Sequence, residues 1–123
     1  MPSSKRIHPQ PSRWSSLIKR LSAAEPDAPV LHPKVYSDID EIMRYYERVA
    51  TRQLADQFYA ELRHYMQQAA ERPESFAIRT RYLRRVNLQR FPYHFLFRTV
   101  GDVVRILVVR HHRRRPTVGV GRR

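Results

Sequence analysis

The sequence of 123 residues contains no cysteine and only three glycines, and a single acidic residue follows position 76. Without cysteine there is no disulfide framework and no thiolate zinc site, which agrees with a reducing compartment. All glycines lie at or beyond position 101, so there is no glycine-rich phosphate loop, and the Gly-x-Ser-x-Gly and His-Glu-x-x-His motifs are absent as well. We therefore expect no metabolic enzyme, no cofactor and no metal.

Long apolar runs are also missing. No stretch approaches the roughly 18 apolar residues that a membrane-spanning helix needs. The N-terminus carries positive charge with no long apolar stretch behind it, which makes it a poor signal peptide. The length supports one domain. We expect a cytoplasmic protein that does not associate with a membrane.

Positive charge is abundant and unevenly placed. The formal net charge is +13, which divides into +4 over residues 1–34, −3 over residues 35–76 and +12 over residues 77–123. The last of these segments contains thirteen arginines and one acidic residue, Asp102. Of the 24 cations, 21 are arginine, whose guanidinium binds phosphate and carboxylate in bidentate fashion. Such asymmetry points to an anionic partner.

Residues 1–29 form a basic extension that holds five of the nine prolines and is rich in serine. Within it, Trp14, Leu17, Ile18 and Leu21 have the spacing of a two-turn basic amphipathic helix over 14–21, marginal by itself in water. Three interpretations stay open: a loosely docked or disordered extension, a tail produced by a misplaced start codon, or a helix that binds a membrane surface or a partner.

A helical hairpin is predicted next. Residues 30–32 are a short apolar stretch that Pro33 stops, so we expect an edge strand there. Ser37 precedes three acids and is the predicted N-cap of a first helix, whose apolar face runs from Ile39 to Val49. Thr51 caps a second helix that Pro73 ends. The short connection makes the two helices antiparallel.

From position 82 the apolar period changes to that of strands. Three strands are predicted, over 82–91, 93–100 and 103–110, with Pro92 between the first two and the Gly101-Asp102 loop closing a β-hairpin. The last strand carries one charge in its first seven residues, so we expect it to be central and buried on both faces. The fold class is therefore α+β, with the helical hairpin packed on one face of a small, mainly antiparallel sheet.

Two histidines, His111 and His112, follow the last strand between Arg110 and three further arginines. Histidine is the usual acid–base group near neutral pH. Neighbouring residues at a strand end point to opposite sides, so these rings cannot chelate one metal together. A structural role stays open beside a functional one, in which guanidinium groups lower an imidazole pKa and stabilise the transition state of RNA cleavage. The lack of nearby carboxylates disfavours metal-dependent nuclease chemistry.

The strand over 82–91 carries arginine on both faces, which is typical of a solvated edge strand and also of a phosphate-binding stripe. In the next strand an aromatic stripe, Tyr93, Phe95 and Phe97, is either core or a base-stacking platform, and we assign it to the face under the helices. His94 and Arg98 then look out from the opposite face, as part of a concave basic surface for RNA, DNA or an acidic peptide.

Several short motifs occur in a fixed order: Ser37-Asp-Ile-Asp-Glu, Ala55-Asp-Gln-Phe58, Arg72-Pro73, Phe91-Pro92-Tyr93 with Phe97-Arg98, Gly101-Asp102, and His111-His-Arg-Arg-Arg-Pro116. Over residues 30–117 this order resembles the RelE/ParE superfamily of bacterial type II toxins, also called plasmid stabilisation proteins. The resemblance implies a toxin domain over 30–123 that arrests growth when free and is held inactive, in a hetero-oligomer, by an antitoxin encoded nearby.

The Phe-Pro-Tyr strand and the His-x-Arg-Arg-x-Pro ending look closer to the ParE side, which implies inhibition of DNA gyrase without a nuclease centre. The residues that we then expect to bind the target are Arg84, Arg85, His94, Arg110, His112, Arg113, Arg114 and Arg115.

Two alternatives remain. A RelE-like protein would be a ribosome-dependent mRNA endonuclease, with Arg81, Arg98 and His111 near the scissile phosphate. The last tyrosine here is Tyr93, whereas such nucleases often use a C-terminal tyrosine. The other alternative is a nucleic-acid-binding module that harms nothing, which predicts a steep dependence of its affinity on salt.

Overall fold

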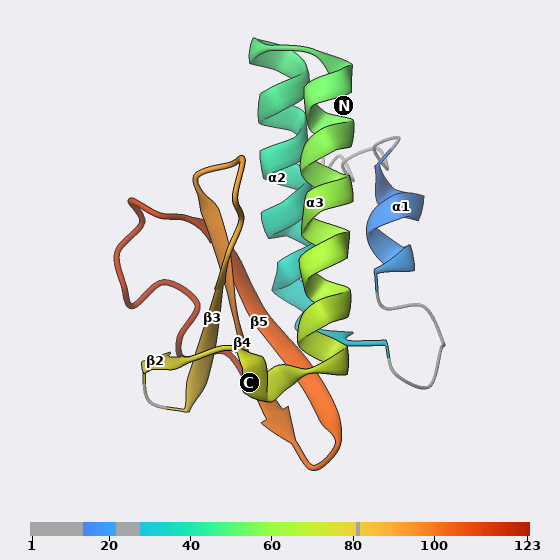
Figure 1. Ribbon diagram of the computed structural model, residues 1–123. Helices are drawn as coiled ribbons and strands as arrows, with labels where there is room; N and C mark the ends of the chain where they lie inside the picture. The colour runs from blue at the N-terminus through green and yellow to red at the C-terminus, as the bar shows by residue number, and fades with distance from the viewer. Residues whose placement is uncertain (1–13, 22–27, 81) are drawn as a thin grey trace, which may run out of the picture.

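The computed structural model of the chain describes residues 14–21, 28–80 and 82–123 (Figure 1). Its helices are α1 (Ser15–Arg20), α2 (Pro33–Val49) and α3 (Arg52–Glu71), with a short 3-10 helix at Pro73–Ser75. Its strands are β1 (Val30–Leu31), β2 (Ile78–Thr80), β3 (Leu83–Asn87), β4 (Tyr93–Val100) and β5 (Val103–His111). They form one sheet in the order β1-β5-β4-β3-β2, in which only β1 runs parallel to its neighbour. The α+β class, with the α2–α3 hairpin packed on the sheet, is confirmed.

Helix α2 begins one turn earlier than the sequence suggested. Its N-cap is His32, whose Nδ1 accepts a hydrogen bond from the Lys34 amide at 3.1 Å, and Pro33 occupies the first turn. Proline suits that place because its missing N–H would have had no partner there. The prediction of Ser37 as the N-cap is wrong, since its hydroxyl donates to the Lys34 carbonyl inside the helix. Asp38 is thereby placed in the second turn.

Helix α3 begins after Thr51, as predicted, because the Thr51 Oγ1 accepts a hydrogen bond from the Leu54 amide at 3.0 Å. The two helices lie antiparallel over one face of the sheet (Figure 1). The prediction that the aromatic stripe of β4 faces the helices is confirmed. The core there includes Ile39, Met43, Phe58, Leu62 and Met66 from the helices and Tyr93, Phe95 and Phe97 from β4.

The basic strand β3 is shorter than predicted and does not lie at the edge. A strand that we did not predict, β2, pairs antiparallel with it through Ile78 and Arg84. With three residues, β2 is too short to show a period. After β3 the chain turns, and the amides of Gln89 and Arg90 both donate to the Glu61 carboxylate, at 2.7 and 3.0 Å.

Strands β4 and β5 form the predicted hairpin. Val100 pairs with Val103 across the two-residue loop, where Gly101 has a φ of 62°, a conformation that other residues rarely adopt. The pairing then shifts, since Leu96 pairs with Val108 while Phe97 pairs with Ile106. The extra residue of β5 is therefore Leu107, a β-bulge. β5 is buried on both faces from Ile106 to Arg110, as predicted, but Val103 at its start is exposed, so the prediction holds only for the second part of the strand.

The short helix α1 packs on the hairpin, on the side away from β3 and β4 in Figure 1. Trp14, Ile18 and Leu21 are buried in the main core, and the Tyr59 hydroxyl donates to the Leu17 carbonyl at 2.7 Å. Residues 14–21 are thus not the loosely docked segment that one interpretation expected. Residues 1–13 and 22–27 of the extension lie outside the described part of the chain. No helix among the described residues is long and apolar enough to cross a membrane.

Candidate functional site

The face of the sheet opposite the helices, here called the outer face, is covered by the residues that follow β5, here called the C-terminal segment (residues 112–123). Arg110 holds this segment in place. Its Nη1 donates to the carbonyls of Pro116 and Val118, both at 2.7 Å, and to that of Arg115 at 3.4 Å. Only 7% of Arg110 is exposed. A guanidinium that turns inward and binds three carbonyls fixes the path of the whole segment.

Arg122 of the C-terminal segment completes the edge of β5 together with Asp38. Strand β1 pairs only with Arg105 and Ile106, which leaves the backbone groups beyond the bulge without a strand partner on that side. Asp38 accepts a hydrogen bond from the Val109 amide at 3.1 Å, and Arg122 donates to the Leu107 carbonyl at 3.0 Å. These two side chains also form an ion pair with each other, at 2.7 Å. They therefore take the place of a longer β1.

The middle of the C-terminal segment lies directly on the sheet. Gly119 has a φ of 80°, and a Cβ atom there would lie 2.4 Å from the Cβ of Val108. Only glycine fits both the backbone conformation and the close approach. Val120 packs on a small apolar cluster of the outer face, which consists of Leu83, Leu96, Leu107 and Val108.

At the end of β4 and β5, four side chains form what we call the imidazole–guanidinium cluster: Arg85, His94, Arg110 and His112. The Arg110 Nε donates to the His94 Nε2 at 2.8 Å, and the Nδ1 atoms of His94 and His112 are 2.9 Å apart. Because His94 Nε2 is an acceptor, a neutral His94 carries its proton on Nδ1 and donates it to His112. The Arg85 Nη2 lies 3.4 Å from the same His112 nitrogen.

This cluster holds its imidazoles neutral. Burial, together with the positive charges of Arg85 and Arg110, lowers the pKa of His94 to about 3. Burial and Arg85 also lower the pKa of His112. Only 1% of His94 is exposed, so the expectation that it looks out from an open basic surface is wrong. His94 is buried because the C-terminal segment covers it, and the alternation of residues along a strand does not reveal such a cover.

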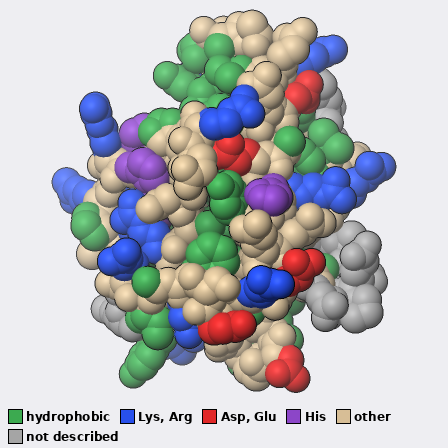
Figure 2. All heavy atoms as spheres, in the orientation of Figure 1, with side chains coloured by type: hydrophobic (Ala, Val, Ile, Leu, Met, Phe, Trp, Pro, Cys, Tyr) green, Lys and Arg blue, Asp and Glu red, His purple; other side chains and the backbone are tan. Residues whose placement is uncertain are grey.

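Past the cluster, Arg113, Arg114 and Arg115 are exposed. They lie where the chain turns, between β5 and the carbonyls that Arg110 holds. Cationic side chains and histidines gather on this side of the molecule, at the left of Figure 2. Neutral histidines behind exposed guanidinium groups form a surface suited to binding an anionic or carbonyl-rich partner.

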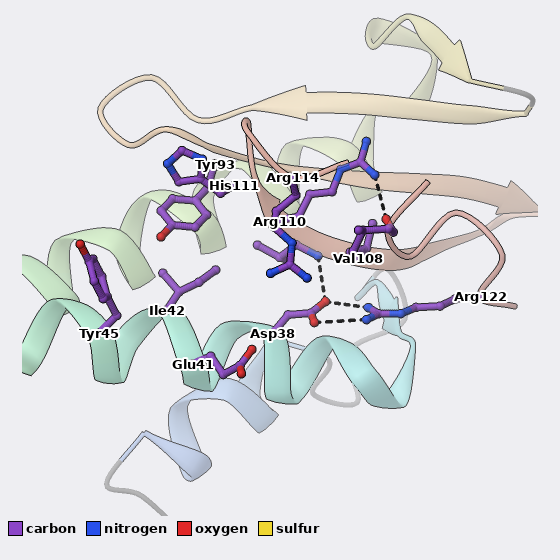
Figure 3. A pocket seen from close by; sticks show the side chains of 12 residues that line it. Asp38, Glu41, Ile42, Tyr45, Tyr93, Val108, Arg110, His111, Arg114 and Arg122 are labelled. Carbon is purple, nitrogen blue, oxygen red and sulfur yellow. Dashed lines mark hydrogen bonds and ion pairs between the residues drawn. The ribbon is translucent and has the colours of Figure 1, made fainter. Parts of the chain in front are cut away.

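A cleft of about 200 Å³ opens between α2 and the end of β5 (Figure 3). Asp38, Glu41 and Tyr45 line it from α2, and His111 and Arg114 line it from the other side. Its two walls thus carry opposite charge. Among the described residues, no three side chains of His, Cys, Asp or Glu gather as a metal site.

The predicted site residues do not all lie on the same face of the sheet. Arg85, His94, Arg110 and His112 come together on the outer face. Arg84, by contrast, pairs with Phe97 in a helix-facing row, and its Nη1 donates to the Phe76 carbonyl at 2.6 Å.

The three residues expected near a scissile phosphate are not brought to one place. His111 lies on the helix side of the sheet, with its ring 5.0 Å from that of Tyr93. Arg98 is on the outer face, four residues along β4 from His94, which is about 13 Å in a strand. Arg81 lies outside the described residues.

Sequence reasoning missed the residues that position the C-terminal segment. Asp38 was interpreted as a first-turn acid, and Gly119 and Arg122 drew no attention. An isolated glycine in a polar stretch is a signal for a special backbone conformation, but nothing in the sequence says which strand it would lie on.

Comparisons with known proteins agree with this fold. The model of the family described as "ParE toxin of type II toxin-antitoxin system, parDE" matches residues 30–116. A solved structure titled "Chromosomal ParDE TA system from P. aeruginosa" superimposes with a TM-score of 0.59 at 20% identity, covering 69% of this chain and 97% of that chain. No curated protein matches. The family match includes Asp38 and Arg110 and stops before Gly119 and Arg122.

Proposed function

This chain belongs to the ParE toxin family of type II toxin–antitoxin systems, and from that premise we propose that it arrests growth by inhibiting DNA gyrase. It is the toxin of a toxin–antitoxin pair, so its natural partner is an antitoxin. We propose that the antitoxin is encoded nearby and that both act in the cytoplasm. The target is the part of this proposal that needs testing.

The observation that carries the proposal is the contrast between two groups of predicted residues. The exposed arginines Arg113, Arg114 and Arg115 follow directly on a strand end that Arg110 and His94 hold in a single arrangement. Such a surface is organised for binding. The residues that an mRNA endonuclease would need together, Arg98 and His111, lie on opposite faces of the sheet. Acid–base chemistry needs its groups within hydrogen-bond reach of one another or of one substrate.

A supercoiling assay tests the target. Purified chain is added to DNA gyrase, relaxed plasmid and ATP, and we expect supercoiling to be inhibited. The triple variant Arg113→Ala, Arg114→Ala, Arg115→Ala should raise the concentration for half-inhibition at least tenfold. The matched control, Arg52→Gln with Arg63→Gln and Arg72→Gln, removes as many charges from exposed positions of the helical layer and at its end, and should inhibit like the parent.

A second arm uses purified ribosomes and a defined message. Cleavage of the message in the ribosomal A site, with gyrase unaffected, would reject the proposal in favour of the endonuclease. Co-expression of the neighbouring small open reading frame should restore growth in cells that make the chain. Growth that is unaffected by the folded chain alone would contradict a toxic function altogether.

A further inference from the structure

The hydrogen bonds of the imidazole–guanidinium cluster run in one direction. An arginine side chain only donates and keeps its charge, so the bond from the Arg110 Nε makes the His94 Nε2 an acceptor. The one proton of a neutral His94 is then on Nδ1, and it is donated to the His112 Nδ1 at 2.9 Å. The direction of the first bond therefore decides the direction of the second.

The two imidazole rings lie as such a bond requires. The planes of His94 and His112 are 11° apart, and their centroids are separated by 5.1 Å. Because the two Nδ1 atoms are 2.9 Å apart, the centroids reach this separation only if the rings meet edge to edge. The Nδ1 atoms thus point at each other, and a proton on one lies on the line to the lone pair of the other, as a strong hydrogen bond needs.

A second donor lies near the same nitrogen of His112. The Arg85 Nη2 is 3.4 Å from the His112 Nδ1, and it too can only donate. Both neighbours of this Nδ1 make it an acceptor, so the proton of a neutral His112 is on Nε2. Burial and the nearby cations lower the pKa of both rings, so neither takes up a second proton at neutral pH.

We propose that Arg110 and His94 are positioning residues for His112: they occupy its Nδ1 and leave its Nε2–H as a donor for an oxygen acceptor of the protein that the chain binds. His112 is exposed, and no hydrogen bond from its Nε2 is found among the described residues. The exposed arginines at 113–115 follow it directly, so this donor belongs to the cationic surface. Successive hydrogen bonds polarise one another, and the guanidinium of Arg110 therefore strengthens the donor at the other end.

The same arrangement excludes another role for His112. A general base needs a free lone pair within reach of the proton that it takes. The one lone pair of a neutral His112 is on Nδ1, where His94 and Arg85 already donate to it. We infer that His112 binds a partner and is not the base of an endonuclease.

The hydrogen-bond chain is a property of the free protein, whereas the use of the donor rests on the proposed function, in which this surface binds a target. Two arms of the experiment keep these apart. The first contains no target at all. The second measures growth arrest, so a failure of gyrase inhibition in the supercoiling assay would reject the proposed target without changing either arm.

The first arm determines the histidine tautomers by NMR, from two-bond 1H–15N correlations of the 15N-labelled chain. In the parent we expect a protonated Nδ1 in His94 and a protonated Nε2 in His112. His94→Leu removes the donor, so the ring of His112 should give the averaged signals of two tautomers. His94→Gln can accept from Arg110 and donate to His112, and should restore the single tautomer. Circular dichroism checks that both variants are folded.

The second arm measures viable count after induction of the chain without antitoxin. His112→Met keeps the length of the side chain and loses the donor, so survival should rise at least tenfold. His112→Gln keeps an N–H near the place of the Nε2–H and should arrest growth like the parent. The matched control is His64→Met on α3, an exposed histidine outside the cluster, which should also behave like the parent.

Three results would overturn the proposal. One is a parent in which His112 carries its proton on Nδ1, or a His112 tautomer that is the same in the parent and in folded His94→Leu, because His94 would then position nothing. Another is full growth arrest by His112→Met at an equal amount of folded protein, which would mean that no partner uses the donor. The third is a loss of toxicity in His112→Gln as large as in His112→Met, which would indicate that the ring itself is needed, as it is for a general base.

Discussion

The two faces of the sheet are covered in different ways. On the helix face, two long helices bury an apolar core in which aromatic rings from β4 meet apolar side chains of α2 and α3. On the outer face, a short irregular segment covers a much smaller apolar cluster, and guanidinium groups hold it through carbonyl oxygens. Burial is non-directional and tolerates small shifts, whereas hydrogen bonds fix positions. The sheet thus has one face built for stability and one built to hold charged groups in place.

The largest effect should come from the helix face. Phe95→Ala empties a site that is fully buried, and we expect it to lower the free energy of unfolding by about 3–5 kcal/mol. The neighbouring Leu96 is as deeply buried but faces the smaller cluster, so Leu96→Ala should cost about 2 kcal/mol. Urea denaturation of both variants provides the measurement. Equal losses would mean that the two faces contribute alike.

Removing the guanidinium that holds the C-terminal segment should have a smaller and more local effect. Arg110→Met keeps most of the side-chain volume, but loses the bonds to the three carbonyls and to His94. We expect a loss of about 2–3 kcal/mol. Hydrogen exchange should accelerate strongly over residues 112–122 and little in α2 and α3. Faster exchange throughout the molecule would contradict the separation of the two faces.

Acid should weaken the outer face selectively. The pKa of His94 is about 3 in the folded chain and near 6.5 when unfolded, so the unfolded chain binds the extra proton between these values. The free energy of unfolding should therefore decrease as the pH falls below 6.5, by up to about 1.4 kcal/mol per pH unit from this residue. The lowered pKa values of His112 and His32 act in the same direction.

A variant isolates the contribution of His94. The side-chain oxygen of glutamine can accept the hydrogen bond from Arg110 and does not titrate, so His94→Gln should have a flatter stability profile between pH 4 and 6.5. Chemical denaturation at a series of pH values gives both profiles. Parallel profiles for parent and variant would show that other groups cause the acid sensitivity.

The smallest effect that we expect is a gain in the free energy of unfolding. Arg98→Gln removes one of two like charges, Arg98 and Arg105, that lie opposite each other in β4 and β5, and Arg98 takes part in none of the ion pairs found among the described residues. We expect the free energy of unfolding to rise by about 0.2–1 kcal/mol at low salt, and the gain to vanish at high salt. Thermal unfolding at two ionic strengths measures it. Destabilisation at low salt would argue that the arginine pair is not repulsive.

The spacing of apolar residues in the sequence was sufficient to predict how the helix face is covered, and insufficient to predict how the outer face is covered. The apolar residues of α2, α3 and β4 repeat at helical and strand spacing, so their common core could be predicted before the structure was known. The cover of the outer face has no period, and depends on Arg110 reaching carbonyls five to eight residues ahead of it. His94 was accordingly assigned to the right face and given the wrong exposure. The bulge at Leu107 and the strand β2 were equally invisible, because each departs from regular pairing.

The strand order has a consequence for the timing of synthesis. Among the described strands β5 is the last along the chain, yet it lies between β1 and β4 and is the one strand with which β1 pairs. A growing chain can form its helical hairpin early, but its sheet stays incomplete until β5 has left the ribosome. At about 5–20 residues per second, several seconds separate the end of α3 from the end of the C-terminal segment. We expect a nascent toxin to be inert during this interval, which gives an antitoxin already present in the cell time to meet it.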